Sequence, residues 1–338
     1  MTHYDSEQSS TVSVIIPAYN SHLTLGQSLD ALEKQSAYKQ IDHIIIVDSS
    51  DNELALEQLE MFRKKEKVIV LTSGIRVMPA KQRNIGAKHA KSELLCFLDS
   101  DAYPSPDWIE KILEANASGV RVGGGSYRLP PFQEDMIIPR AQYFLEFNEF
   151  FDVGRPRNKL MLPSCNLFCE KNLFLKIGGF PEIRASEDTL FGLLANQKAT
   201  LMFFPDISIY HIFREHSDHY YNNQVLIGMY IFIYRKYIYD SVYYRGILPY
   251  ILLPGFILIK LVRILSRIIR SGKMRMKYFL PTSGQFLTGL YYWSKGFWKG
   301  IGKYKDIASS FEQNEQLSPS AIECYRNLAK QFLSRSKN

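Results

Sequence analysis

The sequence predicts an α/β protein built on an open sheet, because short apolar runs alternate with longer amphipathic segments in its N-terminal part. Apolar and β-branched runs typical of buried parallel strands cover residues 12–16, 41–47, 68–71 and 94–98. Segments of helical length, with apolar residues one turn apart, cover residues 23–32, 54–62 and 79–90. This alternation predicts right-handed βαβ crossovers with helices on both faces of the sheet.

Composition indicates a folded protein with reduced cysteines. The chain has 338 residues, of which 46% are hydrophobic, so it can bury a large core. Its cysteines have neither the Cys-x-x-Cys spacing of a zinc or redox site nor the pattern of a secreted disulfide framework; they are Cys96, Cys165, Cys169 and Cys324. Residues 1–11 form a polar extension without the apolar segment of a cleaved signal peptide. We therefore expect the folded part to lie in the cytoplasm.

Polar motifs follow three of the predicted strands, at the sheet edge where open α/β proteins bind ligands. They are Pro17–Asn20, Asp48–Asn52 and Asp99–Asp101. The third motif, Asp99-Ser100-Asp101, places two carboxylates directly after a buried strand, where Mg²⁺ or Mn²⁺ could bind them together with a diphosphate. An ordinary Asp-rich turn is the structural alternative. No Gly-x-Gly-x-x-Gly turn or Gly-Lys-Ser/Thr loop occurs, which argues against dinucleotide-binding and P-loop proteins.

The following region predicts further strands and helices around a long loop. A strand is expected over residues 119–127, and a segment rich in proline and aromatic residues then runs to Pro163, which is typical of a functional loop. A strand, a short helix and a turn are expected next, at residues 163–170, 171–177 and 178–181. Ser186 is expected to cap a helix that begins with Glu187 and Asp188, and capping alone is one explanation of this acidic pair.

Taken in order, these motifs resemble those of the family 2 glycosyltransferases of the GT-A fold. The resemblance runs from about Val12 to about His216. It rests on Val14–Asn20, Ile46–Asp51, Ala80–Gly86, Phe97–Asp101, Ile177–Phe180, Ser186–Asp188 and His211. The resemblance implies a Rossmann-like open mixed sheet with helices on both faces, a nucleotide-diphospho-sugar donor, and Mg²⁺ or Mn²⁺ as cofactor.

The resemblance also implies roles for individual residues. The nucleotide-sugar would be bound by Pro17, Ala18, Tyr19, Asn20, Asp48, Arg83, Asn84 and Ser100. The metal would be held by Asp99, Asp101 and His211, with His216 or His219 as alternatives to the last. Asp188 would be the catalytic base, with Glu187 orienting the base or the acceptor, and the reverse assignment of this pair stays open.

Two departures from the family pattern bear on function. The second motif reads Asp48-Ser49-Ser50, where relatives more often have an Asp-Asp-Gly or Asp-Asn-Gly turn. The Gln-x-x-Arg-Trp motif of the polymerising members is absent, which predicts the transfer of a single sugar. The identity of the sugar, linkage and acceptor depends on the Arg128–Pro163 segment and on pocket shape.

The C-terminal part predicts a basic, aromatic helical region that associates with an anionic membrane surface. Between Tyr220 and Lys305 the only acidic residue is Asp240, while lysine and arginine are frequent. Cations recur every three or four residues in Ile257–Arg270, which predicts an interfacial helix with its basic face toward lipid. The uncharged segment Gly246–Ile259 contains two prolines and falls short of the roughly 20 residues that span a bilayer, which predicts a re-entrant or in-plane stretch.

Aromatic clusters at Tyr291–Trp293 and Phe297–Trp298 also suit the membrane interface. Packing of residues 257–269 against the catalytic domain, or an oligomer contact, is the alternative. Binding to nucleic acid is not expected, because the apolar faces are too extensive for an exposed basic groove. The expected organisation is a polar extension, a GT-A catalytic domain, a membrane-associating region and a short helix, over residues 1–11, 12–216, 217–310 and 311–338.

The resemblance and the tail together predict an inverting, metal-dependent glycosyltransferase that adds one sugar from a nucleotide-diphospho-sugar. UDP is the commonest nucleotide in this family, and TDP and GDP are the alternatives. The predicted acceptor is a lipid-linked or cell-surface glycan precursor, reached by a peripheral or monotopic protein on the cytoplasmic face of the plasma membrane. One alternative is a catalytically silent scaffold for glycan assembly. Another is a sugar-nucleotide pyrophosphorylase, although the early glycine-rich signature loop of those enzymes is absent.

Overall fold

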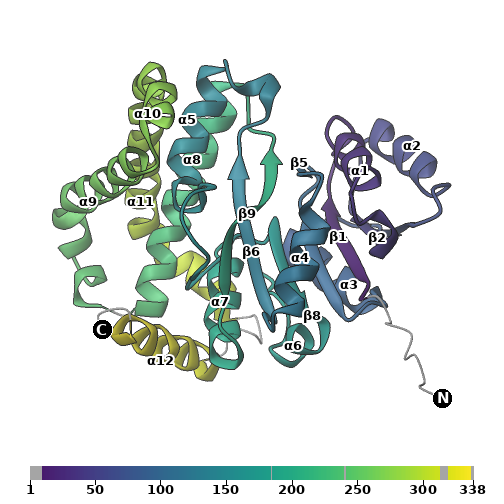
Figure 1. Ribbon diagram of the computed structural model, residues 1–338. Helices are drawn as coiled ribbons and strands as arrows, with labels where there is room; N and C mark the ends of the chain where they lie inside the picture. Colours follow the sequence, from purple (N-terminus) through teal and green to yellow (C-terminus); the bar gives the residue numbers. More distant parts are fainter. Residues whose placement is uncertain (1–9, 184, 240, 313–318, 336–338) are drawn as a thin grey trace.

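The computed structural model describes residues 10–183, 185–239, 241–312 and 319–335. Most of the predicted polar extension therefore lies outside the described residues. A mixed sheet runs through the protein in the order β3-β2-β1-β4-β8-β6-β9-β5, and β7 pairs with β9 (Figure 1). Its strands are β1 (Val12–Ala18), β2 (Ile41–Asp48), β3 (Val68–Thr72), β4 (Leu94–Leu98), β5 (Ala102–Pro104), β6 (Val122–Arg128), β7 (Arg157–Asn158), β8 (Asn166–Glu170) and β9 (Met202–His211).

Helices surround the sheet and build a C-terminal region of their own. In Figure 1, α1 to α4 lie to the right of β6 and β9, whereas α5 and α8 to α11 lie to the left. The helices are α1 (Leu25–Glu33), α2 (Glu53–Phe62), α3 (Pro79–His89), α4 (Trp108–Ala117), α5 (Ile137–Glu146), α6 (Lys171–Lys176), α7 (Glu187–Lys198), α8 (Ser217–Tyr234), α9 (Leu248–Arg270), α10 (Lys273–Phe279), α11 (Ser283–Glu312) and α12 (Pro319–Arg335).

The four parallel strands predicted from the N-terminal sequence are confirmed. β1 pairs in parallel with β2 and β4, and β2 pairs in parallel with β3. Every residue of β1 is buried, which explains its unbroken apolar sequence. Because these strands run the same way, β1, β2 and β4 end at one edge of the sheet, with Ala18, Asp48 and Leu98. The three predicted polar motifs begin at that edge.

The other half of the sheet mixes directions around the glycine-rich strand β6. β8 pairs antiparallel with β4 and β6, while β9 runs parallel to β6. A Cβ atom on Gly125 would lie 1.6 Å from the carbonyl oxygen of Ile207, and one on Gly124 would lie 2.2 Å from that of Asn166. Glycine is therefore required for β6 to fit between β8 and β9. This packing places β9 so that His211 pairs with Ala102 at the ligand edge.

The prediction of a long loop between β6 and Pro163 is wrong in part, because this segment contains α5 and the 3₁₀ turn η3 (Asn148–Phe150). Tyr143 and Phe144 each lie about one helical turn before Phe147, and all three are buried, which is the helical signal that the proline content masked. The Phe147 ring packs on the Tyr127 ring of β6 with their centroids 4.5 Å apart. The segment is therefore anchored to the sheet by aromatic packing.

The helical character of the C-terminal region is confirmed, but its first apolar segment is longer than the sequence predicts. α9 is one continuous helix of 23 residues that runs through Pro254. Within the described residues it is the one helix whose length and hydropathy would allow it to cross a membrane. Of its most apolar stretch of 18 residues, only 17% is buried. The interpretation of two short segments therefore gives way to a single helix with a largely exposed apolar surface.

The predicted direction of the α9 cations is wrong for two of them. Arg267 donates from Nη1 to Asn148 Oδ1 at 2.6 Å and from Nη2 to Glu149 Oε1 at 2.6 Å. Lys260 Nζ lies 4.9 Å from the centroid of the Trp293 ring on α11. Both side chains therefore face protein, on the same side as the buried residues of α9, whereas Arg263 and Arg270 are exposed.

The aromatic residues of α11 divide between packing and exposure. Trp293 and Phe297 are buried, and Tyr292 stacks on Tyr221 of α8 with ring centroids 4.5 Å apart. Tyr291 and Trp298 are more than half exposed, at 59% and 54%. Part of the predicted aromatic belt therefore forms the interior of the helical region, and the rest lies on its surface.

Candidate active site

A buried arginine connects the acidic motifs at the ligand edge. Arg83, on α3, donates from Nη2 to Asp99 Oδ1 at 2.5 Å, and its Nη1 lies 3.6 Å from Glu187 Oε1. The Arg83 side chain is 4% exposed. Burial alone would lower the pKa of Arg83, but the carboxylates of Asp99, Glu187 and Asp188 outweigh it and raise that pKa. The structure thus brings together three carboxylates from β4 and α7 around one fixed cation.

The two carboxylates that begin α7 are held in a low-dielectric environment. Burial raises the pKa of Glu187 to about 8, and the negative charge of Asp188 adds to this rise, while Arg83 opposes it. Burial also raises the pKa of Asp188, against the opposing effects of Arg83 and a hydrogen bond from Ser164. The Oδ1 atom of Asp188 is buried and has no hydrogen-bond partner within the described protein. The protein therefore does not fully satisfy the ionised form of Asp188.

Ser186 does not cap α7 as the sequence predicts. Its backbone adopts the left-handed conformation, with φ +73°, and its side chain accepts no hydrogen bond from the first turn. This conformation is uncommon for a residue with a side chain and costs on the order of 1–3 kcal/mol. Such strain occurs mainly where the surrounding structure fixes a functional segment. Here it marks the start of the helix that carries Glu187 and Asp188.

Asp101 and His211 form a second cluster at the same edge. Asp101 Oδ1 lies 3.7 Å from His211 Nε2, because β5 pairs with β9 directly after the Asp99–Asp101 turn. The other ring nitrogen of His211, Nδ1, is buried without a hydrogen-bond partner. The described residues contain no cluster of three or more His, Cys, Asp or Glu that could hold a metal by itself.

This pair fits the type of metal site that the resemblance implies. A hard divalent cation bound with a nucleotide keeps few protein ligands, and phosphate oxygens and waters fill its other positions. A carboxylate and an imidazole suit Mn²⁺, and the 46% exposure of the Asp101 side chain leaves room for substrate oxygens. Asp99, the third predicted ligand, has one oxygen bonded to Arg83 and is not brought next to His211 by any contact within the described residues. His216 and His219 instead pack on each other, with ring centroids 5.9 Å apart.

The turn after β1 is fixed by bonds to the turn after β2. Asn20 has a left-handed backbone, with φ +52°, and its Nδ2 donates to Asp51 Oδ1 at 2.7 Å. Tyr19 Oη donates to Asp51 Oδ2 at 3.1 Å, and the guanidinium of Arg76 lies 4.2 Å from the centroid of the Tyr19 ring. Asp51 lies within the predicted Ile46–Asp51 motif without an assigned role, and Arg76, in the segment between β3 and α3, is outside every predicted motif. A base that stacks on Tyr19 would share it with Arg76.

The remaining nucleotide residues are placed around this turn. Pro17 and Ala18 are buried at the end of β1, and the Ala18 carbonyl accepts from Gln82 Nε2 at 2.7 Å, so a ligand would meet backbone here. Ser100 Oγ lies 2.8 Å from Ser21 Oγ, which ties the β4 turn to the β1 turn. Together these contacts bring the first and third predicted motifs side by side.

Two residues predicted to contact the nucleotide, Asp48 and Asn84, form hydrogen bonds within the protein. Asp48 is 1% exposed, and its two carboxylate oxygens accept from the backbone N–H and the hydroxyl of Ser50, at 2.9 and 2.6 Å. Asn84 donates to the Phe180 carbonyl at 2.8 Å and accepts from the Phe180 N–H at 2.9 Å. It thereby fixes the turn at Gly179, where φ is +73° and a Cβ would lie 2.5 Å from Asn84 Oδ1. The structure gives both residues positioning roles.

Comparison with known proteins finds a family match in the N-terminal part of the chain. Residues 13–152 match the family model described as glycosyl transferase family 2. This part of the chain is therefore similar to that family. The domain spans the nucleotide-side motifs and the Asp99-Ser100-Asp101 turn, and the Glu187–Asp188 pair and His211 follow it along the chain.

Curated relatives of this domain are themselves named glycosyltransferases. The chain is 28% identical over 215 residues to a poly(ribitol-phosphate) beta-glucosyltransferase of Bacillus spizizenii, covering 62% of this chain and 33% of the relative. It is 33% identical over 135 residues to the amylovoran biosynthesis glycosyltransferase AmsB of Erwinia amylovora, covering 39% of this chain and 43% of the relative. The matches thus span between a third and three-fifths of the length of the first two curated relatives.

Solved structures confirm the GT-A type of fold. The S. aureus protein TarS 1-349 in complex with UDP-GlcNAc is 18% identical, with a TM-score of 0.50, and the match covers 96% of this chain and 92% of that one. The mannosyltransferase PcManGT from Pyrobaculum calidifontis, in complex with GDP-Man and Mn²⁺, is 14% identical, with a TM-score of 0.51, over 95% and 86% of the two chains. The predicted α/β fold of a mixed sheet followed by a helical region is confirmed.

Proposed function

We propose that this glycosyltransferase transfers one sugar, with inversion, from a UDP-sugar to a hydroxyl of a lipid-linked or cell-surface glycan precursor. The observation that carries the proposal is the Arg83 cluster, in which Arg83 pairs with Asp99 and Glu187 and the charge of the neighbouring Asp188 acts on the same guanidinium. UDP is favoured because TarS has been solved in complex with UDP-GlcNAc. The class of acceptor is favoured because two relatives are named as a poly(ribitol-phosphate) beta-glucosyltransferase and an amylovoran biosynthesis glycosyltransferase.

The proposed reaction joins the acceptor oxygen to the anomeric carbon of the donor sugar. Asp188 takes the proton of the acceptor hydroxyl as that oxygen attacks, and the bond from the anomeric carbon to the diphosphate oxygen breaks with its electron pair going to the diphosphate. Attack from the side opposite the leaving group inverts the anomeric configuration. The guanidinium of Arg83, held by Asp99, places positive charge close to the reacting groups.

Asp101 and His211 are the residues that would hold Mg²⁺ or Mn²⁺ in this proposal. A divalent cation bound there supplies positive charge to the departing diphosphate, which is worth several kcal/mol of transition-state stabilisation. The protein holds the His211 imidazole, on β9, and the Asp101 carboxylate, directly before β5, 3.7 Å apart.

The metal assignment predicts a strong effect of a single substitution. Asp101→Ala should lower the rate of Mn²⁺-dependent UDP-sugar hydrolysis about 100-fold and weaken Mn²⁺ binding, because one of two protein ligands is lost. The measurement is UDP release from a panel of UDP-sugars, with Mn²⁺ affinity followed by electron paramagnetic resonance. Asp107→Ala, which removes a carboxylate paired with Lys111 at the start of α4, is the matched control. Equal Mn²⁺ affinity in the Asp101→Ala and wild-type proteins would contradict the assignment.

We further propose that the outer side of α9 lies in the plane of an anionic membrane, on the cytoplasmic face. This side is a stripe of exposed apolar residues, Ile251, Leu258, Ile259, Val262 and Ile269. Arg263 and Arg270 are exposed beside it and suit anionic headgroups. The opposite side is bound to the rest of the protein through Arg267 and the buried Ile264 and Ile268, which favours an in-plane over a spanning position.

Vesicle flotation tests this proposal. The full-length protein should float with vesicles containing phosphatidylglycerol, and the double variant Leu258→Glu/Val262→Glu should lose most of this binding, because both side chains are at least half exposed and apolar. Leu54→Glu/Met61→Glu, which changes two exposed apolar residues of α2, is the matched control and should float like the wild type. Failure of the wild-type protein to float, or equal flotation of both double variants, would contradict the proposal.

A further inference from the structure

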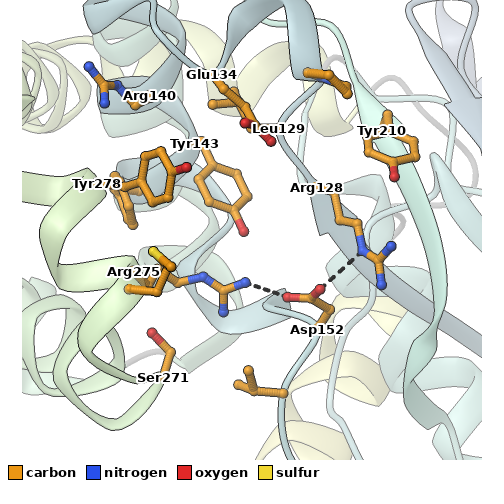
Figure 2. A pocket seen from close by; sticks show the side chains of 14 residues that line it. Arg128, Leu129, Glu134, Arg140, Tyr143, Asp152, Tyr210, Ser271, Arg275 and Tyr278 are labelled. Atoms are coloured by element: carbon orange, nitrogen blue, oxygen red, sulfur yellow. Dashed lines mark hydrogen bonds and ion pairs between the residues drawn. The ribbon is translucent and has the colours of Figure 1, made fainter.

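A cavity of about 620 Å³ lies between the catalytic domain and α10, outside the site described above (Figure 2). The end of β6, helix α5, the segment after η3 and helix α10 form its wall. Three arginines and two carboxylates line it, Arg128, Arg140, Arg275, Glu134 and Asp152. None of the residues assigned above to the nucleotide, the metal or the base lines the cavity. The positive charge of this cavity is therefore not part of the donor site assigned above.

The arginines of this cavity are incompletely satisfied by protein groups. Asp152 accepts from Arg128 Nε at 3.0 Å through one oxygen and pairs with Arg275 through the other, so two guanidinium groups share one carboxylate (Figure 2). Arg275 Nη1 and Arg140 Nε are buried and have no hydrogen-bond partner within the described residues. A buried donor without an acceptor costs about 1–3 kcal/mol, and an oxyanion in the cavity would supply the acceptors.

The rest of the wall suits a group larger than a single oxyanion. The rings of Tyr143, Tyr210 and Tyr278 face the same cavity as the arginines. Its volume falls within the range of pockets that enclose a small organic ligand, and is larger than a lone phosphate needs. A phosphate attached to a sugar or sugar alcohol would place its charge at the arginines and its carbon-bound surface against the tyrosines.

The cavity and the Asp101–His211 pair meet at strand β9, whose Tyr210 lines the cavity. Tyr210 precedes His211 in β9 and is the register partner of Arg128. The Tyr210 ring stacks on Tyr103 with centroids 5.0 Å apart, and Tyr103 follows Asp101 by two residues. Because consecutive side chains of a strand point to opposite faces, a ligand in the cavity would be separated from His211 by strand β9. That relation fits one unit of an acceptor whose neighbouring unit receives the sugar.

We propose that this cavity binds a phosphate group of the acceptor, and so selects phosphate-bearing acceptors over neutral ones. The proposal rests on the glycosyltransferase function proposed above and names the chemical class of its acceptor. The phosphate can belong to a repeating polyol-phosphate polymer or to a lipid-linked precursor, and both present the same group to Arg128, Arg140 and Arg275.

Direct binding tests the proposal independently of sugar transfer. The probes are poly(ribitol phosphate), polyprenyl phosphate in neutral detergent micelles, and dextran as a neutral polymer, each titrated calorimetrically against the full-length protein without donor or metal. The wild type should bind at least one phosphate probe and not dextran. Arg140→Gln should weaken that binding about 10-fold, because a charge-assisted guanidinium–phosphate contact is lost. Arg140→Lys should weaken it less, because lysine keeps the positive charge although it lacks the planar, two-donor geometry of the guanidinium.

Arg155→Gln is the matched control, because Arg155 is exposed, carries the same charge and does not line the cavity. It should bind as the wild type does, and thermal melting should show that Arg140→Gln and Arg155→Gln are equally folded. Binding of the polymer alone would identify a polymer acceptor, and binding of the micelles alone a lipid-linked one; either supports the cavity as a phosphate site. Wild-type affinity in Arg140→Gln, equal binding of dextran, or no binding of either phosphate probe would overturn the proposal, whatever the result of the donor-hydrolysis assays.

Discussion

Replacing Asp188 with Asn is expected to lower kcat for sugar transfer about 1000-fold, because a general base contributes roughly 10²- to 10⁴-fold to such a step. Asn has the same size but cannot take the proton of the acceptor hydroxyl. UDP affinity should change little, since Asp188 lies on α7 while the nucleotide motifs follow β1, β2 and β4. The measurement is the initial rate of transfer together with UDP affinity by calorimetry.

The matched variant for this experiment is Glu187→Gln, the neighbouring carboxylate in the same cluster. If Asp188 is the base, Glu187→Gln should retain at least a tenth of the wild-type kcat, whereas the reverse assignment predicts the opposite order of the two variants. Full activity of Asp188→Asn would remove this residue from the mechanism.

The same assignment predicts how transfer depends on pH. A base acts only when ionised, and burial raises the pKa of both members of the pair, that of Glu187 to about 8. The value of kcat/KM should therefore increase with pH from the acid side, and the increase should continue above the range in which exposed carboxylates titrate. Removing the charge of Asp188 lowers the pKa of Glu187, because that charge is one of the causes of its rise. Any residual activity of Asp188→Asn that depends on Glu187 should thus titrate at lower pH.

The sequence predicted the ligand edge well because its geometry is local. Residues that directly follow a parallel strand lie at the edge of the sheet, so Asp48 and Asp99 could be placed from strand pattern alone. The strand pattern could not give the partners of those side chains. Asp48 is satisfied by Ser50 two residues away, and Asp99 by Arg83 on a helix that precedes it. Hydrogen-bond partners depend on rotamers and packing, which no periodicity encodes.

In the C-terminal region, the sequence likewise could not predict which side of a helix faces the protein. The three- and four-residue spacing correctly gave α9 one basic and one apolar side, but either side could have faced the protein. The structure decides this through Glu149 and Asn148, which lie in the segment predicted to be loop and accept from Arg267. Because these two acceptors lie at that place, Arg267 turns toward the protein, while Arg263 and Arg270 stay exposed beside the apolar side. Orientation was therefore set by residues more than a hundred positions away.

Replacing Arg83 with Gln is expected to lower the free energy of unfolding by about 3–5 kcal/mol at neutral pH, because removing one partner of a buried ion pair leaves the other charges uncompensated. Here Asp99, Glu187 and Asp188 all lose the cation that stabilises their ionised forms. The melting temperature should fall by about 10 °C, as judged from the usual relation between free energy and melting temperature for large domains. The measurement is thermal unfolding at pH 5, 7 and 9.

The loss should grow with pH. In the wild type the pKa of Glu187 is about 8 in the folded protein against an ordinary value of 4.5, so the folded state holds this proton more tightly than the unfolded chain does. Stability from this group is complete below pH 4.5 and is lost as the pH rises toward 8. Without Arg83 the pKa of Glu187 rises further, because Arg83 is a cause that lowers it. The pH 9 sample of Arg83→Gln should therefore be the least stable.

Arg121→Gln is the matched control for this change. Arg121 pairs with Glu170 at 2.7 Å, but both side chains are at least a third exposed, at 45% and 33%. A pair of this type contributes about 0–1 kcal/mol, so its loss should move the melting temperature by no more than a few degrees and with little dependence on pH. Equal destabilisation by Arg83→Gln and Arg121→Gln, or a pH-independent loss in Arg83→Gln, would show that the Arg83 cluster is not the charged centre on which the active-site geometry depends.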